Sequence, residues 1–203
     1  MLSIEQIIHG LPTGFTRSHH STPWLMVKEL QGTLQGIIKH LDDDYITHNN
    51  VAIHRTAIVE TGAIIKGPAI IGPNCFIGAN AYLRGGVYLD SSVIIGPGCE
   101  VKGSIIMSNT HLAHFNFVGD SIIGNDVNFE AGAVICNHWN EKEDKLIKLF
   151  FHSEFIETGL EKFGAIVGDN SKIGANAVLS PGTVLGKNSV VKRLELIEQI
   201  HSV

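Results

Sequence analysis

Polar side chains of the kind used in catalysis gather in the segment 107–123. His111, His114, Asn116 and Asp120 lie there, where the otherwise regular pattern of the chain is broken. A break in a consistent pattern is where function is expected. Imidazole titrates near physiological pH, so His114 suits a general base, the plainer alternative being a histidine that bonds a carbonyl at a turn. We interpret His111 as a surface residue and Asp120 as a turn residue.

Two cations stand eighteen residues apart, Arg84 in the sequence AYLRGG and Lys102 in EVKGS. In a solenoid with eighteen residues per coil, such residues occupy the same face of consecutive coils. Stacked like charges repel, so the pair predicts an anion-binding site, the alternative for each being a solvated charge at a corner. The formal net charge of −5 offers no broad basic surface, so a few placed cations must meet any anionic ligand.

A repeat of six residues positions these side chains. Stepping by six from Ile53, every position as far as Met107 is aliphatic or Met, and the register returns at 123–135 and 167–191. A period of six fits neither a helix nor a simple two-sided strand, but it fits a short strand followed by a tight corner. Three such hexads close one triangular coil, and stacked coils bury a continuous core. The sequence therefore predicts an all-β solenoid, a parallel β-helix of hexapeptide repeats.

Other segments do not follow this period. Residues 1–50 predict an N-terminal helical segment, whose second helix begins near Thr22–Pro23 and packs an apolar stripe on the solenoid or on a neighbouring subunit. The β-helix spans 51–191 and is interrupted by an insertion at 138–164, and an insertion of that length is usually functional or part of an interface. Residues 192–203 predict a short C-terminal helix that closes the last coil.

Composition excludes several classes of function. Hydrophobic residues make up 44% of the chain and charged residues 17%, which excludes a disordered chain. The acidic balance argues against nucleic acid or a membrane surface as a partner. The chain has three cysteines, and Cys136 in particular is expected to be a packed small residue rather than a nucleophile. With no visible signal peptide and no apolar span, we expect a cytoplasmic protein.

One longer pattern is specific. It consists of the string H-x-x-F-V-G-D, which begins at His114 and includes Phe117. Small and amide residues follow it, namely Asn128, Ala131, Gly132 and Asn137, and two cations, Arg84 and Lys102, precede it. This pattern resembles the acetyl-acceptor motif of the glucosamine-1-phosphate acetyltransferases, the acetyltransferase half of the bifunctional N-acetylglucosamine-1-phosphate uridyltransferases. The resemblance covers residues 50–137 well and residues 164–191 generically. It implies a left-handed β-helix and a homotrimer with sites in the clefts between solenoids.

The resemblance also implies a reaction, the transfer of an acyl group from acetyl-CoA to an amino-sugar phosphate or a related sugar nucleotide, with no metal required. In that reaction His114 would take the proton of the attacking amine, and Arg84 and Lys102 would hold the phosphate. Asn128 would bond sugar hydroxyls, and Asn137 would orient the amine or the base.

The same resemblance implies positions near the coenzyme. A main-chain N–H at Ala131 or Gly132 would face the thioester oxygen, and Ala175 would lie on the acetyl-CoA side. The chain also departs from the motif, with Phe117 in place of a Tyr, Glu130 in place of a Gly and Ala175 in place of a Ser.

Two alternatives remain open at the level of the sequence. The departures favour a non-catalytic solenoid that binds a sugar phosphate or sugar nucleotide and has lost its coenzyme site. A γ-type carbonic anhydrase on the same fold would need zinc held by histidines of adjacent subunits, and His111, His114 and His138 are the only plausible set. The spacing of His111 and His114 disfavours this reading, because two positions of opposite orientation do not face one ligand.

Overall fold

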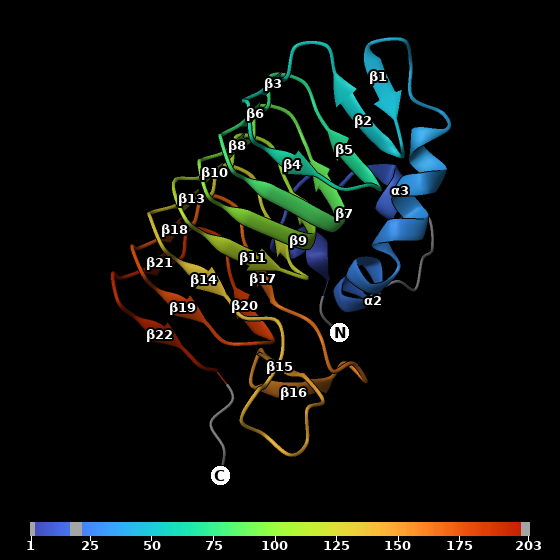
Figure 1. Ribbon diagram of the computed structural model, residues 1–203. Helices are drawn as coiled ribbons and strands as arrows, with labels where there is room; N and C mark the ends of the chain where they lie inside the picture. Colours follow the sequence, from blue (N-terminus) through green and yellow to red (C-terminus); the bar gives the residue numbers. More distant parts are fainter. Residues whose placement is uncertain (1–2, 17–21, 200–203) are drawn as a thin grey trace.

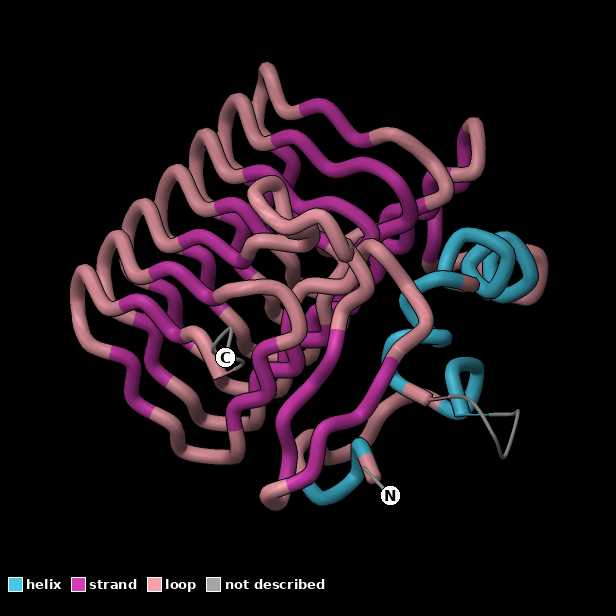
Figure 2. Tube along the Cα trace, turned by 90° about the horizontal axis from the view of Figure 1, so that it is seen from below, coloured by secondary structure: helices cyan, strands magenta, loops and turns pink. Residues whose placement is uncertain are grey.

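The computed structural model describes residues 3–16 and 22–199, in which a parallel β-helix of three faces carries helices against one face (Figure 1). Figure 2 shows the successive coils obliquely, with the helices to one side. The predicted fold class, a solenoid of hexapeptide repeats with N-terminal helices, is confirmed. No helix among the described residues is long and apolar enough to cross a membrane.

Three stacks of parallel strands form the faces. The first, the helix-covered face, contains β2 (Val51–His54), β5 (Ala69–Ile71), the second half of β7 (Tyr82–Leu89), the second half of β9 (Glu100–Ile106), β12 (Ile122–Ile123), β17 (Ala165–Val167) and β20 (Thr183–Leu185). The second, the Arg84 face, contains β4 (Ile64–Ile65), the first halves of β7 and β9, β11 (Phe117–Gly119), β14 (Val134–Ile135), β19 (Val178–Leu179) and β22 (Leu196–Ile197). The third, the Asn128 face, contains β3 (Ile58–Val59), β6 (Phe76–Ile77), β8 (Ile94–Ile95), β10 (His111–Leu112), β13 (Asn128–Phe129), β18 (Lys172–Ile173) and β21 (Val190–Val191).

The sixth-residue positions from Ile71 to Val101 fill the interior of the coils. The expected register is wrong for Met107, because the pairing of β7 with β9 shifts by one residue, so that Ile106 is inside and Met107 belongs to the outer cluster. Ile71, Ile77, Leu83 and Leu89 are fully buried, and each fully buried aliphatic side chain stabilises the fold by about 1.5–3 kcal/mol. Cysteines occupy some of the smaller inward positions, and burial raises the pKa of the Cys75 thiol to about 11. Burial also raises the pKa of the Cys99 thiol and of the Cys136 thiol, which disfavours the thiolate that a nucleophile needs.

The helix-covered face is apolar on its outside as well as its inside. Its outward side chains are buried beneath the N-terminal segment and the insertion: Ala52, Ile70, Ile105, Ile122, Ile166 and Val184. The N-terminal segment consists of η1 (Ile4–Gln6), α1 (Thr13–Thr16), α2 (Pro23–Lys28) and α3 (Leu30–Ile38), followed by β1 (Tyr45–His48), which pairs antiparallel with β2. Leu30 and Leu34 of α3 are fully buried against this face.

Two local predictions need correction. The single amphipathic helix expected from Thr22 is broken at Glu29, whose ψ of 1° ends α2 and lets α3 start in a new direction along the face. The C-terminal helix expected over 192–203 is wrong for residues 192–199, where β22 pairs in register with β19. The physical reason is that Ile197 stands six residues after Val191 and packs against the core, so the repeat continues. Residues 200–203 lie outside the described residues.

The insertion at 138–164 forms an antiparallel hairpin rather than an irregular loop. Its strands are β15 (Lys148–Phe151) and β16 (Glu154–Glu157), drawn in orange below the solenoid in Figure 1. Ile147, Leu149 and Phe163 are fully buried and belong to the same cluster as the N-terminal helices. The insertion therefore extends the apolar cover of the solenoid toward its C-terminal coils.

The corner between the Asn128 face and the Arg84 face has a left-handed residue in every coil. The residues with positive φ at this corner are Gly62, Asn80, Gly98, Phe115, Gly132, Asn176 and Leu194. Glycine and asparagine adopt this conformation readily, but other residues bring Cβ close to the following carbonyl. Phe115 and Leu194 are nevertheless found here, with φ of 53° and 60°, and their side chains are 72% and 79% exposed.

Replacing Leu194 with Asn is expected to stabilise the protein. The exposed side chain loses little burial, while relief of the left-handed strain contributes about 1 kcal/mol, or roughly 2–4 °C in Tm for a chain of this size. The measurement is thermal unfolding by circular dichroism. Val190→Asn is the matched control, because Val190 is similarly exposed at 70% but lies in β21. An equal gain in both variants would refute the strain argument.

Candidate functional site

Arg84 and Lys102 lie directly opposite one another on β7 and β9, as their spacing predicted. Each cation has a carboxylate partner of its own. The Arg84 guanidinium contacts Glu100 Oε1 at 2.7 Å, and Lys102 Nζ donates to Asp120 Oδ2 at 2.5 Å. Because each positive charge is paired with a carboxylate of the chain, the two cations lie side by side without a bound anion. The sequence held a signal for both partners, since Glu100 shares the strand face of Lys102 and Asp120 follows Lys102 by eighteen residues.

Asp120 is the centre of a small polar cluster at the edge of the Arg84 face. Its Oδ2 accepts hydrogen bonds from both Lys102 Nζ and Asn137 Nδ2. Gly103 makes room for it, because a Cβ at that position would lie 2.3 Å from Asp120 Oδ1. Asn137 is only 8% exposed, and its hydrogen bond to Asp120 holds the side-chain amide in place. Asp120, interpreted from the sequence as a turn residue, has a left-handed φ of 46° and links two of the predicted site residues as well.

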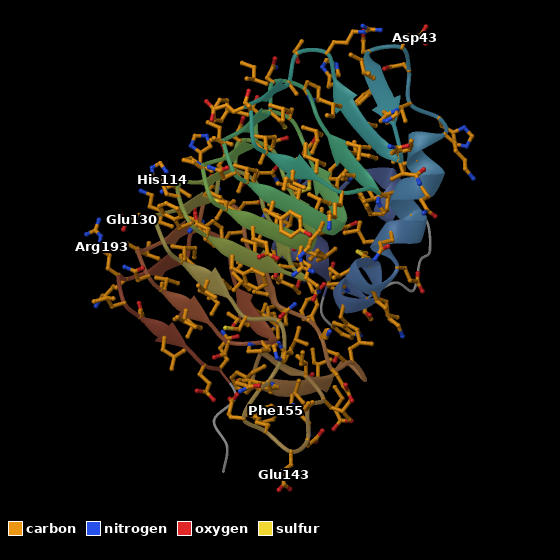
Figure 3. The ribbon with its side chains drawn as sticks, viewed as in Figure 1. Asp43, His114, Glu130, Glu143, Phe155 and Arg193 are labelled. Atoms are coloured by element: carbon orange, nitrogen blue, oxygen red, sulfur yellow. The ribbon has the colours of Figure 1, made fainter. Side chains whose placement is uncertain are left out.

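His114 lies on the ridge where the Asn128 face meets the Arg84 face. Figure 3 labels it on the same edge of the solenoid as Glu130 and Arg193. Its side chain is exposed and forms no hydrogen bond with any described residue, while its carbonyl accepts a bond of 2.8 Å from the Gly132 amide. The imidazole is therefore open to a ligand or to a neighbouring chain.

The ridge beside His114 is held by a charged contact between coils. Glu130 receives two hydrogen bonds from the Arg193 guanidinium, at 2.5 and 2.7 Å, and a third of 2.8 Å from the Ala175 amide. Arg193 and the Ala175 amide hold the pKa of the Glu130 carboxyl below its usual range. The Ala175 and Gly132 amides already donate hydrogen bonds. Of these three residues, Ala131 alone has an amide with no acceptor among the described residues.

The remaining predicted site residues divide between two faces. Phe117 is half-buried on the Arg84 face next to Glu100, and its ring supplies no hydroxyl. Asn128 is exposed on the Asn128 face next to His111. Within one chain the structure thus groups Arg84, Lys102, Phe117 and Asn137 on one face, His114, Ala131, Gly132 and Ala175 on the ridge, and Asn128 beyond it.

The histidines considered for zinc do not gather in one chain. His111 lies on the Asn128 face, His114 on the ridge, and His138 beside Asn137 at the far edge of the Arg84 face. Within residues 3–16 and 22–199, no group of three His, Cys, Asp or Glu side chains is arranged to hold a metal ion.

Replacing Asp120 with Asn is expected to lower the free energy of unfolding by about 1–3 kcal/mol, because the neutral amide leaves the Lys102 ammonium without its charged partner in a largely buried cluster. Chemical denaturation of the two proteins measures the difference. The control is Glu157→Gln, which removes the exposed pair with Lys148 at 3.3 Å and is expected to cost less than about 1 kcal/mol. Equal losses in the two variants would contradict the role assigned to Asp120.

Comparison with known proteins places the chain among hexapeptide-repeat proteins. Residues 47–137 match the family described as the GMPPB C-terminal domain, and residues 164–192 match the hexapeptide repeat of succinyl-transferase. The bifunctional protein GlmU of Methanococcus vannielii is 40% identical over 97 residues, which is 48% of this chain and 23% of that protein. A bifunctional sugar-1-phosphate nucleotidylyltransferase/acetyltransferase of Sulfurisphaera tokodaii is 40% identical over 93 residues, 45% of this chain and 22% of that protein.

Likeness to solved structures is lower. A putative acetyltransferase of Bacillus cereus is 13% identical with a TM-score of 0.41, covering 72% of this chain and 71% of that one. The chain spans about a quarter of the length of the curated relatives it matches. It is a hexapeptide-repeat β-helix protein that shares 97 residues at 40% identity with a bifunctional GlmU protein.

Proposed function

We propose that this chain is an acyl-CoA-dependent N-acetyltransferase that acts on an amino-sugar phosphate or a related sugar nucleotide. One observation carries the proposal. Arg84 and Lys102 stand side by side on the face that ends at the His114 ridge, within residues 47–137, which match the GMPPB C-terminal domain. Cations for a phosphate and a free imidazole are the groups that the transfer of an acyl group to a phosphorylated amine requires.

The proposed reaction assigns a step to each group. The amine nitrogen attacks the carbonyl carbon of the thioester, a C–N bond forms and the C–S bond breaks. His114 takes the proton from the nitrogen and returns it to the leaving sulfur, which departs as a thiol. The Ala131 amide, free of other acceptors in the described part of the chain, donates to the carbonyl oxygen as negative charge develops there. Lys102 and Arg84 exchange part of their carboxylate pairing for the substrate phosphate.

The placement of Asn128 bears on the assembly of the site. Because Asn128 lies on a different face from Arg84, one chain alone does not surround a substrate, and we propose that a second copy completes the site in a homotrimer. Large apolar side chains remain exposed on both uncovered faces, as subunit contacts would require: Ile58 and Val190 on the Asn128 face, and Ile64 and Leu196 on the Arg84 face.

A second candidate function is a non-catalytic solenoid that binds a sugar phosphate. The observation that favours it is the contact of Glu130 with Arg193 and the Ala175 amide, which occupies the part of the ridge where a coenzyme would lie. Phe117 also lacks the hydroxyl that the resembled motif offers to the substrate.

Replacing His114 with Ala separates these candidates. The variant is expected to lose about 10²- to 10⁴-fold in the rate of thiol release from acetyl-CoA with glucosamine 1-phosphate, because the attacking amine loses its base. Isothermal titration with acetyl-CoA and with the sugar phosphate shows whether both ligands still bind. His111→Ala is the matched control, an exposed histidine three residues away that has no role in the proposed step.

Thiol release that is unchanged in His114→Ala would refute the assigned base. Binding of the sugar phosphate with no binding of acetyl-CoA would establish the non-catalytic candidate instead.

The proposed assembly has its own measurement. Light scattering coupled to size exclusion is expected to give three times the chain mass of 22.0 kDa, because the exposed apolar residues of the two uncovered faces pack against neighbouring copies. Ile64→Asp, which places a charge in such a contact, is expected to shift the protein toward monomer. A monomer in the unsubstituted protein at working concentration would contradict a site shared between copies.

A further inference from the structure

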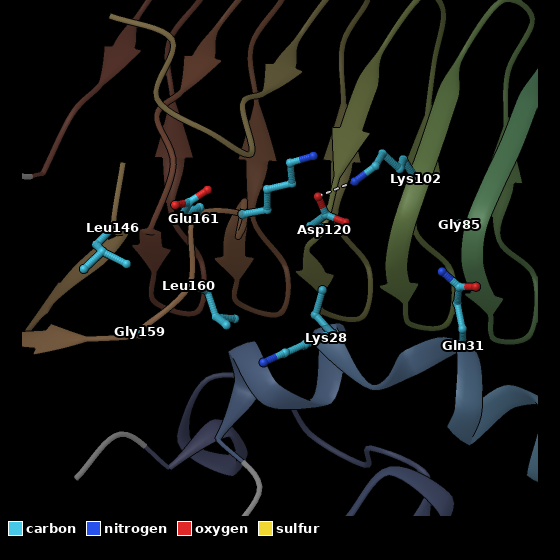
Figure 4. A pocket seen from close by; sticks show the side chains of 11 residues that line it. Lys28, Gln31, Gly85, Lys102, Asp120, Leu146, Gly159, Leu160 and Glu161 are labelled. Atoms are coloured by element: carbon cyan, nitrogen blue, oxygen red, sulfur yellow. Dashed lines mark hydrogen bonds and ion pairs between the residues drawn. The ribbon is translucent and has the colours of Figure 1, made fainter. Parts of the chain in front are cut away.

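A cavity of about 580 Å³ opens beside Lys102, at the edge of the Arg84 face (Figure 4). Three parts of the chain that are far apart in sequence line it. The N-terminal helices contribute Lys28 and Gln31, the solenoid contributes Lys102 and Asp120, and the insertion contributes the stretch 159–162. The two elements outside the hexapeptide repeat therefore meet at a residue of the proposed site.

The lining carries an excess of positive charge on a chain whose net charge is negative. Three lysines, Lys28, Lys102 and Lys162, face two carboxylates, Asp120 and Glu161. Lys102 is paired with Asp120, but Lys28 and Lys162 form no ion pair within the part of the chain that the structure describes. Both lysines are exposed, so their ammonium groups are available to an anionic ligand in the cavity.

Arg84 is not part of this lining, and its guanidinium is held by Glu100. The cavity therefore offers a phosphate two lysines that the sequence pattern did not indicate, one from α2 and one from the insertion. It also offers groups for the rest of a ligand. The Asp120 carboxylate and the Gln31 side-chain oxygen accept hydrogen bonds from hydroxyl or amine groups.

We propose that this cavity binds a phosphorylated sugar, with Lys28 and Lys162 joining Lys102 on the phosphate and Asp120 and Gln31 on the sugar. Its volume lies within the range of small-molecule sites, about 300–1,000 Å³. The inference rests on the proposed function for the identity of the ligand class, and it adds that the N-terminal helices and the insertion form part of the acceptor site. Their lysines add two point charges to the phosphate contact that Lys102 makes.

The test is isothermal titration of the full chain with glucosamine 1-phosphate and, separately, with inorganic phosphate. Lys28→Gln and Lys162→Gln are each expected to lower the affinity for glucosamine 1-phosphate by about tenfold, because each removes a charged hydrogen bond to the phosphate. Higher salt is expected to weaken binding to the unsubstituted protein more than to the variants. Lys39→Gln is the matched control, an exposed lysine just after α3 that lies outside the lining and is expected to leave binding unchanged.

Unchanged affinity in both Lys28→Gln and Lys162→Gln would overturn the proposal. So would inorganic phosphate that binds as tightly as glucosamine 1-phosphate, since the sugar would then make no contact. This test measures affinity and not the rate of acetyl transfer. If no thiol is released but both variants bind the sugar phosphate more weakly, the proposed function fails while the binding site stands. Circular dichroism is the check that the variants keep the fold, as expected for substitutions at exposed side chains.

Discussion

The stacking of coils in register is the constraint on which the rest of this structure depends. Each coil must return an aliphatic side chain to the same place, as Ile53 pairs with Ile71 and Ile71 with Leu89. Once that register is set, every outward position is also aligned from coil to coil. The ladder that buries the core therefore brings Arg84 beside Lys102 without any further specification. A solenoid turns sequence spacing directly into spatial proximity.

The same stacking concentrates strain and polarity at the corners. The ridge that carries His114 needs a left-handed residue in each coil, and most coils supply Gly or Asn there. Phe115 and Leu194 break that preference next to the Glu130–Arg193 contact. At the other edge of the Arg84 face, Gly103 makes room for the Asp120 carboxylate, which joins Lys102 to Asn137. Both edges of this face are thus built from residues that a regular hexad would not contain.

Packing outside the coils decides which surfaces remain available. The N-terminal helices and the hairpin of the insertion bury the outside of one face, where Ile70, Ile105 and Ile166 would otherwise be exposed. The Arg84 face and the Asn128 face stay open and retain exposed apolar side chains. One face is therefore covered by the chain itself and the other two stay open. A cavity lies where the cover ends beside Lys102.

The sequence by itself determined the solenoid and the alignment of Arg84 with Lys102, because a period of six leaves only one way to bury the aliphatic residues. It also indicated His114 as a candidate base, which stays a prediction. Only the tertiary structure decided that Glu100 and Asp120 pair with the two cations, that Glu130 uses the Ala175 amide, and that β22 replaces a C-terminal helix. It alone brought Lys28 and the insertion to Lys102. The contacts of Lys28 and of the insertion join residues whose separation follows no repeat, so they depend on how helices and hairpin pack on the finished coil.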